Sequence, residues 1–183
     1  MNKQNISKEI IINKTLELIE EKQSIQKINL RKIAKELNCA HTNLYNYFSS
    51  YNDLLWNALA ESIKIMNQSI FTEKSLENII DSFIQFSIDH KGLYRLIWYE
   101  RIDGEVPGEI KELLLEPQRK TYENLKDKYE NWDEVSNRIQ VSLAYVHGEI
   151  TIMINNRNMG NNSDEKYWKQ KIKKNAINIF NKY

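Results

Sequence analysis

Cysteine, proline and glycine are scarce in this chain of 183 residues, which contains one Cys, two Pro and five Gly. The single cysteine, Cys39, excludes an internal disulfide and leaves no pair of thiolates for a metal site, which fits a reducing cytoplasm best. Because few residues interrupt helices and 41% of the residues are hydrophobic, we expect long helices around a sizeable core.

Long apolar runs and an excess of one charge are also missing. No stretch approaches the roughly 20 apolar residues of a membrane span, and the N-terminus lacks the apolar run of a signal peptide, so we expect a soluble, cytoplasmic protein. The formal net charge is +1, with eight Lys or Arg against six Asp or Glu in residues 1–55. Bulk charge therefore does not indicate nucleic-acid binding, and an argument for it must come from geometry.

Apolar residues recur at helical spacing along the chain, and no segment shows the alternation of a strand. The pattern predicts helices over residues 11–19, 30–37, 41–48, 54–66, 79–88, 93–98, 110–129, 133–155 and 164–182. Pro117 should kink or break the helix in which it falls. We predict an all-α fold, with a three-helix DNA-binding domain over residues 1–50 and a larger helical domain over residues 51–183.

Two short helices are expected near the N-terminus, over residues 30–37 and 41–48. Asn29 is a suitable N-cap for the first of them. Asn38 begins the connection, and Asn tolerates positive φ better than other non-glycine residues, so it permits a sharp turn. Two helices of about eight residues joined by three residues are typical of a helix-turn-helix, because a generic helical hairpin has longer arms.

The second of these helices has an outward face without charge. With Leu44 placed inward on a helical wheel, Ala40 and Phe48 also face the core. The other side consists of residues that can form hydrogen bonds, none of them a carboxylate: His41, Thr42, Asn43, Tyr45, Asn46 and Tyr47. Asn can bind adenine in a bidentate manner, Thr offers a methyl group to thymine, and Tyr hydroxyls bind phosphate. An ordinary solvated face is the alternative, but such faces in this chain are otherwise rich in Lys and Glu, so we predict DNA contact.

The same segment resembles the TetR family of transcriptional regulators. The matching runs are Leu30-Arg31-Lys32-Ile33-Ala34-Lys35-Glu36-Leu37, Thr42-Asn43-Leu44-Tyr45-Asn46-Tyr47-Phe48 and Asp53-Leu54-Leu55. They resemble the I-A motif of that family's second helix, the L-Y-x-x-F motif of its third and the leucine-led start of its fourth. The resemblance is specific over roughly residues 8–60 and weak beyond. It implies an all-α homodimer in which each DNA-binding domain is joined to a larger helical domain that binds an effector.

The resemblance also implies roles for single residues. The base-contacting positions correspond to Arg31, His41, Thr42 and Tyr45, and the phosphate-contacting positions to Asn29, Asn43, Asn46 and Tyr47. The predicted set of DNA contacts also includes Lys32 and Tyr51. The family usually has Gly or Pro in place of Thr42, and Lys in place of Tyr51. The missing Lys removes one phosphate partner, so we expect a lower DNA affinity or a weaker salt dependence than is usual in the family.

Two amphipathic helices are expected at the C-terminus. Their apolar residues keep strict helical spacing: Ile139, Leu143, Val146 and Ile150, then Trp168, Ile172 and Ile179. Such helices suit an isologous four-helix dimer interface, but packing within one chain explains the periodicity equally well. The resemblance favours a homodimer.

Aromatic side chains with polar tips are frequent between residues 92 and 150. We predict that they line a cavity for a small apolar or aromatic effector, although each could also be a core residue. The predicted effector-binding residues are Tyr94, Trp98, Tyr99, Tyr122, Tyr145 and His147.

Catalytic and cofactor motifs are not found. The sequence has no Gly-rich phosphate loop, no His-Glu-x-x-His motif and no recognisable nucleophile. His41, His90 and His147 are widely separated and lack metal-ligand spacing. We therefore expect no enzymatic activity, cofactor or metal, and predict a dimeric, sequence-specific DNA-binding repressor released by a small effector. An activator, or an adaptor controlled by a protein partner, is the alternative that the sequence leaves open.

Overall fold

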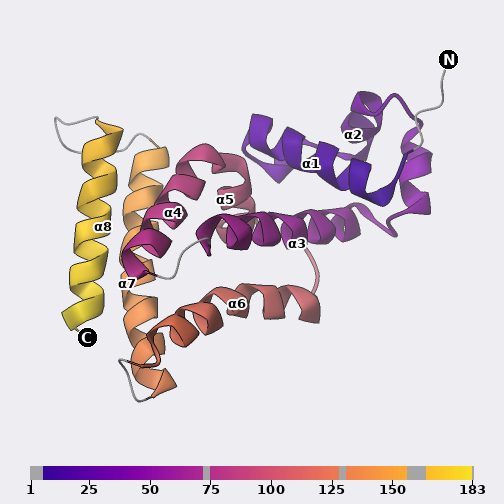
Figure 1. Ribbon diagram of the computed structural model, residues 1–183. Helices are drawn as coiled ribbons and strands as arrows, with labels where there is room; N and C mark the ends of the chain where they lie inside the picture. Colours follow the sequence, from indigo (N-terminus) through magenta and orange to yellow (C-terminus); the bar gives the residue numbers. More distant parts are fainter. Residues whose placement is uncertain (1–5, 72–74, 128–130, 156–163, 183) are drawn as a thin grey trace. The chain divides into compact units, whose positions relative to one another are not determined.

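The computed structural model of the protein describes residues 6–71, 75–127, 131–155 and 164–182. Every regular element in these residues is helical, which confirms the predicted all-α class (Figure 1). In chain order the elements are α1 (Lys8–Lys22), the 3-10 helix η1 (Ile25–Lys27), α2 (Leu30–Glu36), the 3-10 helix η2 (His41–Asn46), α3 (Tyr51–Ile70), α4 (Leu76–Asp89), α5 (Lys91–Trp98), α6 (Gly108–Leu125), α7 (Trp132–Ile154) and α8 (Glu165–Lys182). The predicted helices overlap these elements, whereas η1 has no counterpart in the prediction.

Local side-chain chemistry sets several helix ends. The side-chain oxygen of Asn29 accepts a hydrogen bond from Lys32 N at 3.0 Å, which confirms Asn29 as the N-cap of α2. The side chain of Asn131 accepts one from Glu134 N at 2.7 Å in the same way and starts α7. α1 ends at Gln23, whose backbone is left-handed with a φ of 53°.

The chain forms two compact units that are not contiguous in sequence. The first comprises Met1–Ile65 and His90–Leu114, and the second comprises Met66–Asp89 and Leu115–Tyr183. The boundary predicted at residue 50 differs from this division by packing, because residues 51–65 of α3 and all of α5 belong to the unit that contains the N-terminal helices. The predicted division concerned function, and in that sense it stays a prediction.

The first unit has a core shared by its N-terminal helices, α3, α5 and the start of α6. The side chains that are almost completely buried in it are Ile11, Ile19, Ile33, Leu44, Leu54, Ile63, Tyr94, Leu96 and Ile110. Residues from both segments of the unit are in this set, so residues 90–114 complete the core around the N-terminal helices.

A glycine allows α5 to approach α1 closely. A Cβ at Gly92 would lie 2.5 Å from the carbonyl oxygen of Ile19, closer than any real Cβ contact, so only glycine fits there. The carboxylate of Glu20 accepts a hydrogen bond from Gly92 N at 2.9 Å and lies 3.1 Å from His90 Nδ1. These contacts join the start of α5 to the end of α1.

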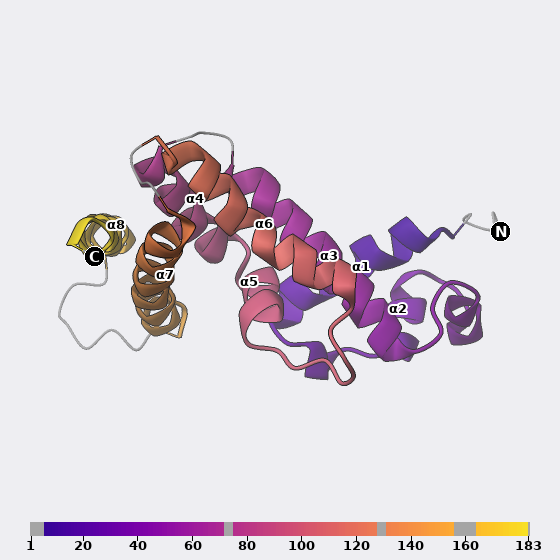
Figure 2. The same cartoon turned by 90° about the horizontal axis from the view of Figure 1, so that it is seen from below.

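The second unit is built around α7 and α8, which lie side by side and antiparallel (Figures 1 and 2). The residues buried between and beneath them are Val135, Ile139, Val146 and Ile150 of α7, and Trp168, Ile172, Ala176 and Phe180 of α8. Ser142 donates a hydrogen bond to the carbonyl of Ala176 at 3.0 Å. The ammonium groups of Lys169 and Lys173 of α8 lie 3.9 and 3.3 Å from the Asp81 carboxylate of α4.

Pro117 does not break its helix. α6 continues from Gly108 to Leu125 with Pro117 inside it, so of the predicted kink or break, the break does not occur. A proline in a helix interior leaves a carbonyl one turn earlier without its usual donor, and here the helix tolerates that loss. No helix in the described residues is long and apolar enough to cross a membrane.

Candidate nucleic-acid interface

The segment predicted to contact DNA forms η2, a short 3-10 helix that follows α2. The connection between them contains Asn38 with a φ of 52°, as predicted. Leu44 is completely buried and Phe48 nearly so, which confirms them as the inward residues. Ala40 is exposed, and its prediction as a core residue is wrong. Its extended backbone precedes the first turn of η2, so it does not share the helical phase of Leu44.

The outward face of η2 has the exposure that the helical wheel predicts. His41, Thr42, Asn43, Tyr45, Asn46 and Tyr47 are all exposed, and 53% of Tyr45 is accessible. In the described residues, no hydrogen bond or ion pair engages the side chains of the first five of them. We call these five residues, with Tyr47, the η2 face. The polar groups of the first five are directed to solvent and are not used to hold the fold together.

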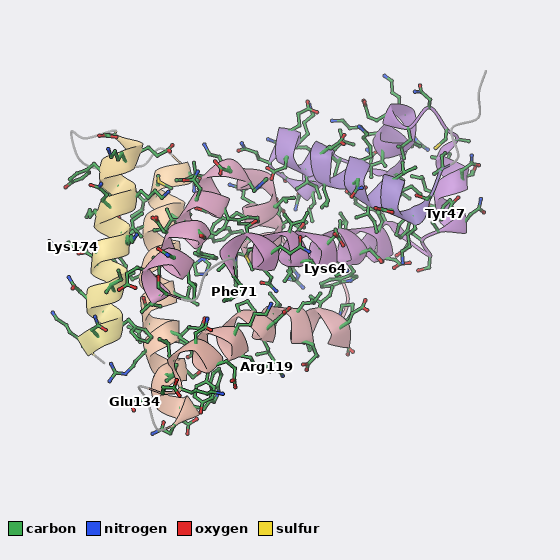
Figure 3. The ribbon with its side chains drawn as sticks, viewed as in Figure 1. Tyr47, Lys64, Phe71, Arg119, Glu134 and Lys174 are labelled. Carbon is green, nitrogen blue, oxygen red and sulfur yellow. The ribbon has the colours of Figure 1, made fainter. Side chains whose placement is uncertain are left out.

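Tyr47, labelled in Figure 3, differs from the rest of the η2 face. Its hydroxyl donates a hydrogen bond to the carbonyl oxygen of Ile6, just before α1. The ammonium of Lys8 lies 5.5 Å from the centre of the Phe48 ring, in the range of a cation–π contact. The start of α1 is therefore attached to the end of η2, which limits the freedom of η2 relative to the core.

The three predicted contacts at α2 differ in exposure. Arg31 is exposed and Lys32 is half-buried. Asn29 is exposed as well, but its side-chain oxygen caps α2, so only its amide N–H groups are available to a phosphate oxygen.

Tyr51 lies at the start of α3, where the resembled family has Lys. Its hydroxyl is 3.1 Å from the carbonyl oxygens of both Ile25 and Ile28 and donates to them. Burial, with a smaller contribution from the charge of Glu100, raises the pKa of Tyr51 to about 12, so the hydroxyl stays protonated at neutral pH. Tyr51 thus holds η1 against α3, and this role uses the hydrogen that a phosphate contact would need.

The residue that sequence reasoning missed is Lys27. It lies in η1, between the two residues that Tyr51 holds, and its side chain is exposed. Ser24 caps η1 by accepting a hydrogen bond from Gln26 N at 3.2 Å. The Ser24 cap is the local signal that could have shown that this stretch is ordered, because Ser is a preferred N-cap.

The predicted effector residues are divided between the two units. Tyr94, Trp98 and Tyr99 belong to the first. Tyr94 is completely buried, and its ring centre lies 5.8 Å from that of Tyr99. Burial raises the pKa of Tyr94 far above its usual value. It is a core residue, whereas Trp98 and Tyr99 are exposed.

The other three belong to the second unit and are half-buried. The hydroxyl of Tyr145 accepts a hydrogen bond from Asn175 Nδ2 at 2.9 Å. His147 meets Phe83 edge to face at 5.3 Å, and burial lowers its pKa to about 4. Tyr122 lines a cavity of about 420 Å³ at the surface of α6.

The predicted dimer residues are mostly used within the chain. Ile139, Val146, Ile150, Trp168 and Ile172 are buried in a single copy, so the alternative interpretation of the periodicity, packing within one chain, holds for these five. Leu143 and Ile179 are half-buried.

The apolar residues that α7 leaves exposed are on another face. Val141 and Ile152 are 40% and 39% accessible, and the exposed residues Ala144 and Gly148 lie between them. We call these four residues the α7 stripe.

The histidines show no arrangement of a metal site. His41 is exposed on η2, His90 contacts Glu20, and His147 packs on Phe83. In the ranges that the structure describes, no three His, Cys, Asp or Glu side chains are grouped so that they could hold a metal ion.

The similarity of this chain to known proteins is a similarity of fold. No family model and no curated protein matches the chain. Among solved structures, SCO4313, described as a candidate regulatory protein, matches with a TM-score of 0.76 at 15% identity, over 93% of this chain and 97% of its own. A protein of unknown function from Rhodococcus sp. RHA1 matches with a TM-score of 0.77 at 12% identity, over 99% and 98%. The chain therefore shares its all-α fold with these proteins along nearly its whole length.

Proposed function

We propose that this protein is a dimeric, sequence-specific DNA-binding transcriptional regulator of the TetR type, acting as a repressor that a small effector releases. The observation that carries the proposal is the η2 face. Five of its exposed polar side chains, none of them a carboxylate, have no partner within the described residues. They lie on an element that the buried side chains of Leu44 and Phe48 anchor to the core. Groups with unused donors and acceptors on a rigid support are what recognition of base edges requires.

Exposed cations on the elements that precede η2 support the same proposal. Lys8, Lys27 and Arg31 are exposed on α1, η1 and α2. Phosphate contacts position a protein on DNA, while base contacts give specificity. We assign the phosphate role that the family gives to the position of Tyr51 to Lys27, since Tyr51 donates to backbone carbonyls.

A second copy is needed because one small reading element binds DNA too weakly. Two copies must present their η2 faces to successive major grooves, about 34 Å apart. We place the dimer contact on the α7 stripe, since the residues first predicted for it are buried within one copy. Residues 141, 144, 148 and 152 follow helical spacing, and the small side chains at 144 and 148 allow a second α7 to approach closely.

The experiment that tests DNA recognition is selection of binding sites from random double-stranded DNA with the full chain. Enrichment of a two-fold-symmetric site is the expected result. Thr42→Ala should relax specificity at one position in each half-site, while Lys64→Gln, on the exposed surface of α3, should leave the site unchanged. Failure to enrich any sequence would overturn the proposal.

An adaptor that binds a protein partner is the second candidate. Trp98, Tyr99 and Val106 are large apolar side chains exposed in the first unit, and they favour it. The two candidates differ in one measurement. If a protein partner is the signal, DNA binding by the wild-type chain should not respond to small molecules, and Trp98→Ser should remove binding of the partner while leaving DNA binding intact.

A further inference from the structure

The 3-10 geometry of η2 sets how the side chains of the η2 face are arranged. Asn43 N donates a hydrogen bond to the carbonyl oxygen of Ala40 at 2.9 Å, three positions before it, as in a 3-10 helix. Side chains three positions apart therefore eclipse each other along η2. Leu44 is completely buried and shares its row with His41 and Tyr47, at the start and just after the end of η2. The other two rows flank the outward direction.

These two rows differ in chemistry. One row consists of two carboxamides, those of Asn43 and Asn46. The other consists of Thr42 and Tyr45, which present a methyl group and an aromatic ring besides their hydroxyls. All four side chains are exposed, and no hydrogen bond within the described residues engages them. Their donors, acceptors and apolar atoms can therefore all contact base edges.

A G·C pair is recognised in the major groove mainly by charged side chains. Guanine presents two acceptors, N7 and O6, which Arg or Lys binds, and cytosine presents the N4 donor, which Asp or Glu binds. Residues 40–48 contain none of these four residue types. A carboxamide does not replace a guanidinium on guanine, because its oxygen would lie opposite a second acceptor with no hydrogen between them.

An A·T pair matches both rows. Adenine presents the N7 acceptor beside the N6 amino donor, which the donor and acceptor of one carboxamide can bind together. Thymine presents the O4 acceptor and the C5-methyl group, which match the hydroxyl and apolar groups of Thr42 and Tyr45. We propose that the η2 face selects A·T pairs in the major groove, with adenines bound by the Asn43–Asn46 row and thymine methyl groups packed against the Thr42–Tyr45 row.

This inference rests on the proposed function and assigns a new role to the two asparagines. The family resemblance implies phosphate contacts for Asn43 and Asn46, whereas here they bind bases. Arg31 is the only Arg before residue 95, and it lies on α2, outside η2. A guanine bound by Arg31 would therefore lie outside the positions that the η2 face contacts.

The first test identifies the base pairs that each side chain contacts. Sites are selected from random double-stranded DNA with the wild-type chain and with Asn43→Ala, Asn46→Ala and Thr42→Ser, the last of which removes a methyl group and keeps the hydroxyl. A position that loses its preference in a variant is one that the changed side chain contacts, and it should be A·T in the wild-type site. Asn178→Ala removes an exposed carboxamide from α8 and should leave the selected site unchanged.

The second test changes single groups of the DNA, so it applies to the wild-type chain directly. 7-Deazaadenine lacks the N7 acceptor and uracil lacks the C5-methyl group, and both keep Watson–Crick pairing. 7-Deazaadenine at an asparagine-contacted position should weaken wild-type binding about tenfold and should not affect the matching Ala variant. Uracil at the Thr42 position should weaken wild-type binding about fourfold, as expected for one methyl group, and should not affect Thr42→Ser.

The outcomes separate this inference from the proposed function. A G·C pair at a position that relaxes in any of the three variants would overturn the inference, and so would the absence of a relaxed position in both Asn variants. An effect of either analogue that persists in the matching variant would overturn it as well. DNA-binding function would stand in each of these cases. Selection that enriches no sequence would instead overturn the proposed function.

Discussion

The η2 face and the outward face of α8 are both polar and exposed, but they differ in charge. The 18 residues of α8 include six lysines. Three of these are half-buried at the edges of that face and lie within 4 Å of carboxylates: Lys169 and Lys173 near Asp81, and Lys171 near Glu149. Lys174 lies on the side of α8 away from α7 (Figure 3). The η2 face has no Lys, Arg, Asp or Glu.

The difference in charge between the two faces indicates different roles for them. Charged side chains keep a helix solvated, and their exposed ion pairs add little stability. Uncharged donors and acceptors without intramolecular partners add no stability, and they are less strongly hydrated than charges. A partner can therefore displace water from them at a lower free-energy cost. We interpret α8 as a solvated surface and η2 as a recognition surface, and the predictions below are ordered from the largest expected effect.

The largest effect should follow from a charge in the α7 stripe. Val141→Glu would place a carboxylate in the proposed dimer contact, so we expect monomers and a loss of specific DNA affinity of about a hundredfold or more. Sedimentation and DNA titration measure the two effects. Lys174→Glu is the matched change on α8 and should leave the dimer intact. Dissociation by Lys174→Glu instead would make α8 the interface and end its interpretation as a solvated surface.

Substitution of two tyrosines of similar exposure, one on each surface, allows a direct comparison of the two surfaces. Tyr45 on η2 and Tyr167 on α8 are 53% and 47% accessible. Tyr45→Ala should weaken binding to the selected DNA by about 1–3 kcal/mol, the usual contribution of a base contact, and Tyr167→Ala should not. Neither change should lower the melting temperature noticeably. Equal effects of the two variants on DNA affinity would remove the distinction between the surfaces.

His147 should make stability depend on pH. Because burial lowers its pKa from 6.5 to about 4 in the folded chain, the unfolded chain binds more protons between these values. The stabilisation that neutral His147 provides is present above pH 6.5 and is lost as the pH falls toward 4. Between pH 6.5 and pH 4, the free energy of unfolding of the wild-type chain should fall by about 1–3 kcal/mol more than that of His147→Gln, as measured by denaturant unfolding. An unchanged pH profile in the variant would show that His147 is not the group responsible.

The smallest effect is expected for Lys27. Lys27→Gln should weaken binding to all DNA sequences equally and reduce the slope of log affinity against log salt by about 0.9, the value for one phosphate contact. Lys64→Gln removes a charge from α3, about 20 Å along the helix from its start, and should leave the slope unchanged. The assignment of Lys27 would fail if its variant kept the wild-type slope.

Local features of the fold could be predicted from the sequence. The cap at Asn29, the positive φ at Asn38 and the burial of Leu44 and Phe48 depend on residues within a few positions of one another. The outward direction of the η2 face follows from the same local phase. The error at Ala40 is also local, because an extended residue that precedes a helix does not share the helical phase.

Contacts between distant residues could not be predicted from periodicity. Gly92 meets Ile19, and the Tyr51 hydroxyl reaches Ile25, across gaps of more than twenty residues. Nothing in the spacing of residues 90–114 indicates that they complete the core of the N-terminal helices.

The sequence by itself determined the helical class, the approximate positions of the helices other than η1, and the inward phase of Leu44 and Phe48, because these depend on hydrogen bonds and side-chain spacing within one segment. Only the tertiary structure decided which neighbour each apolar face meets. It buries Ile139 and Ile172 within one copy and leaves Val141 and Ile152 exposed. Helical periodicity could not decide this, because it shows that a face is covered but not which element covers it.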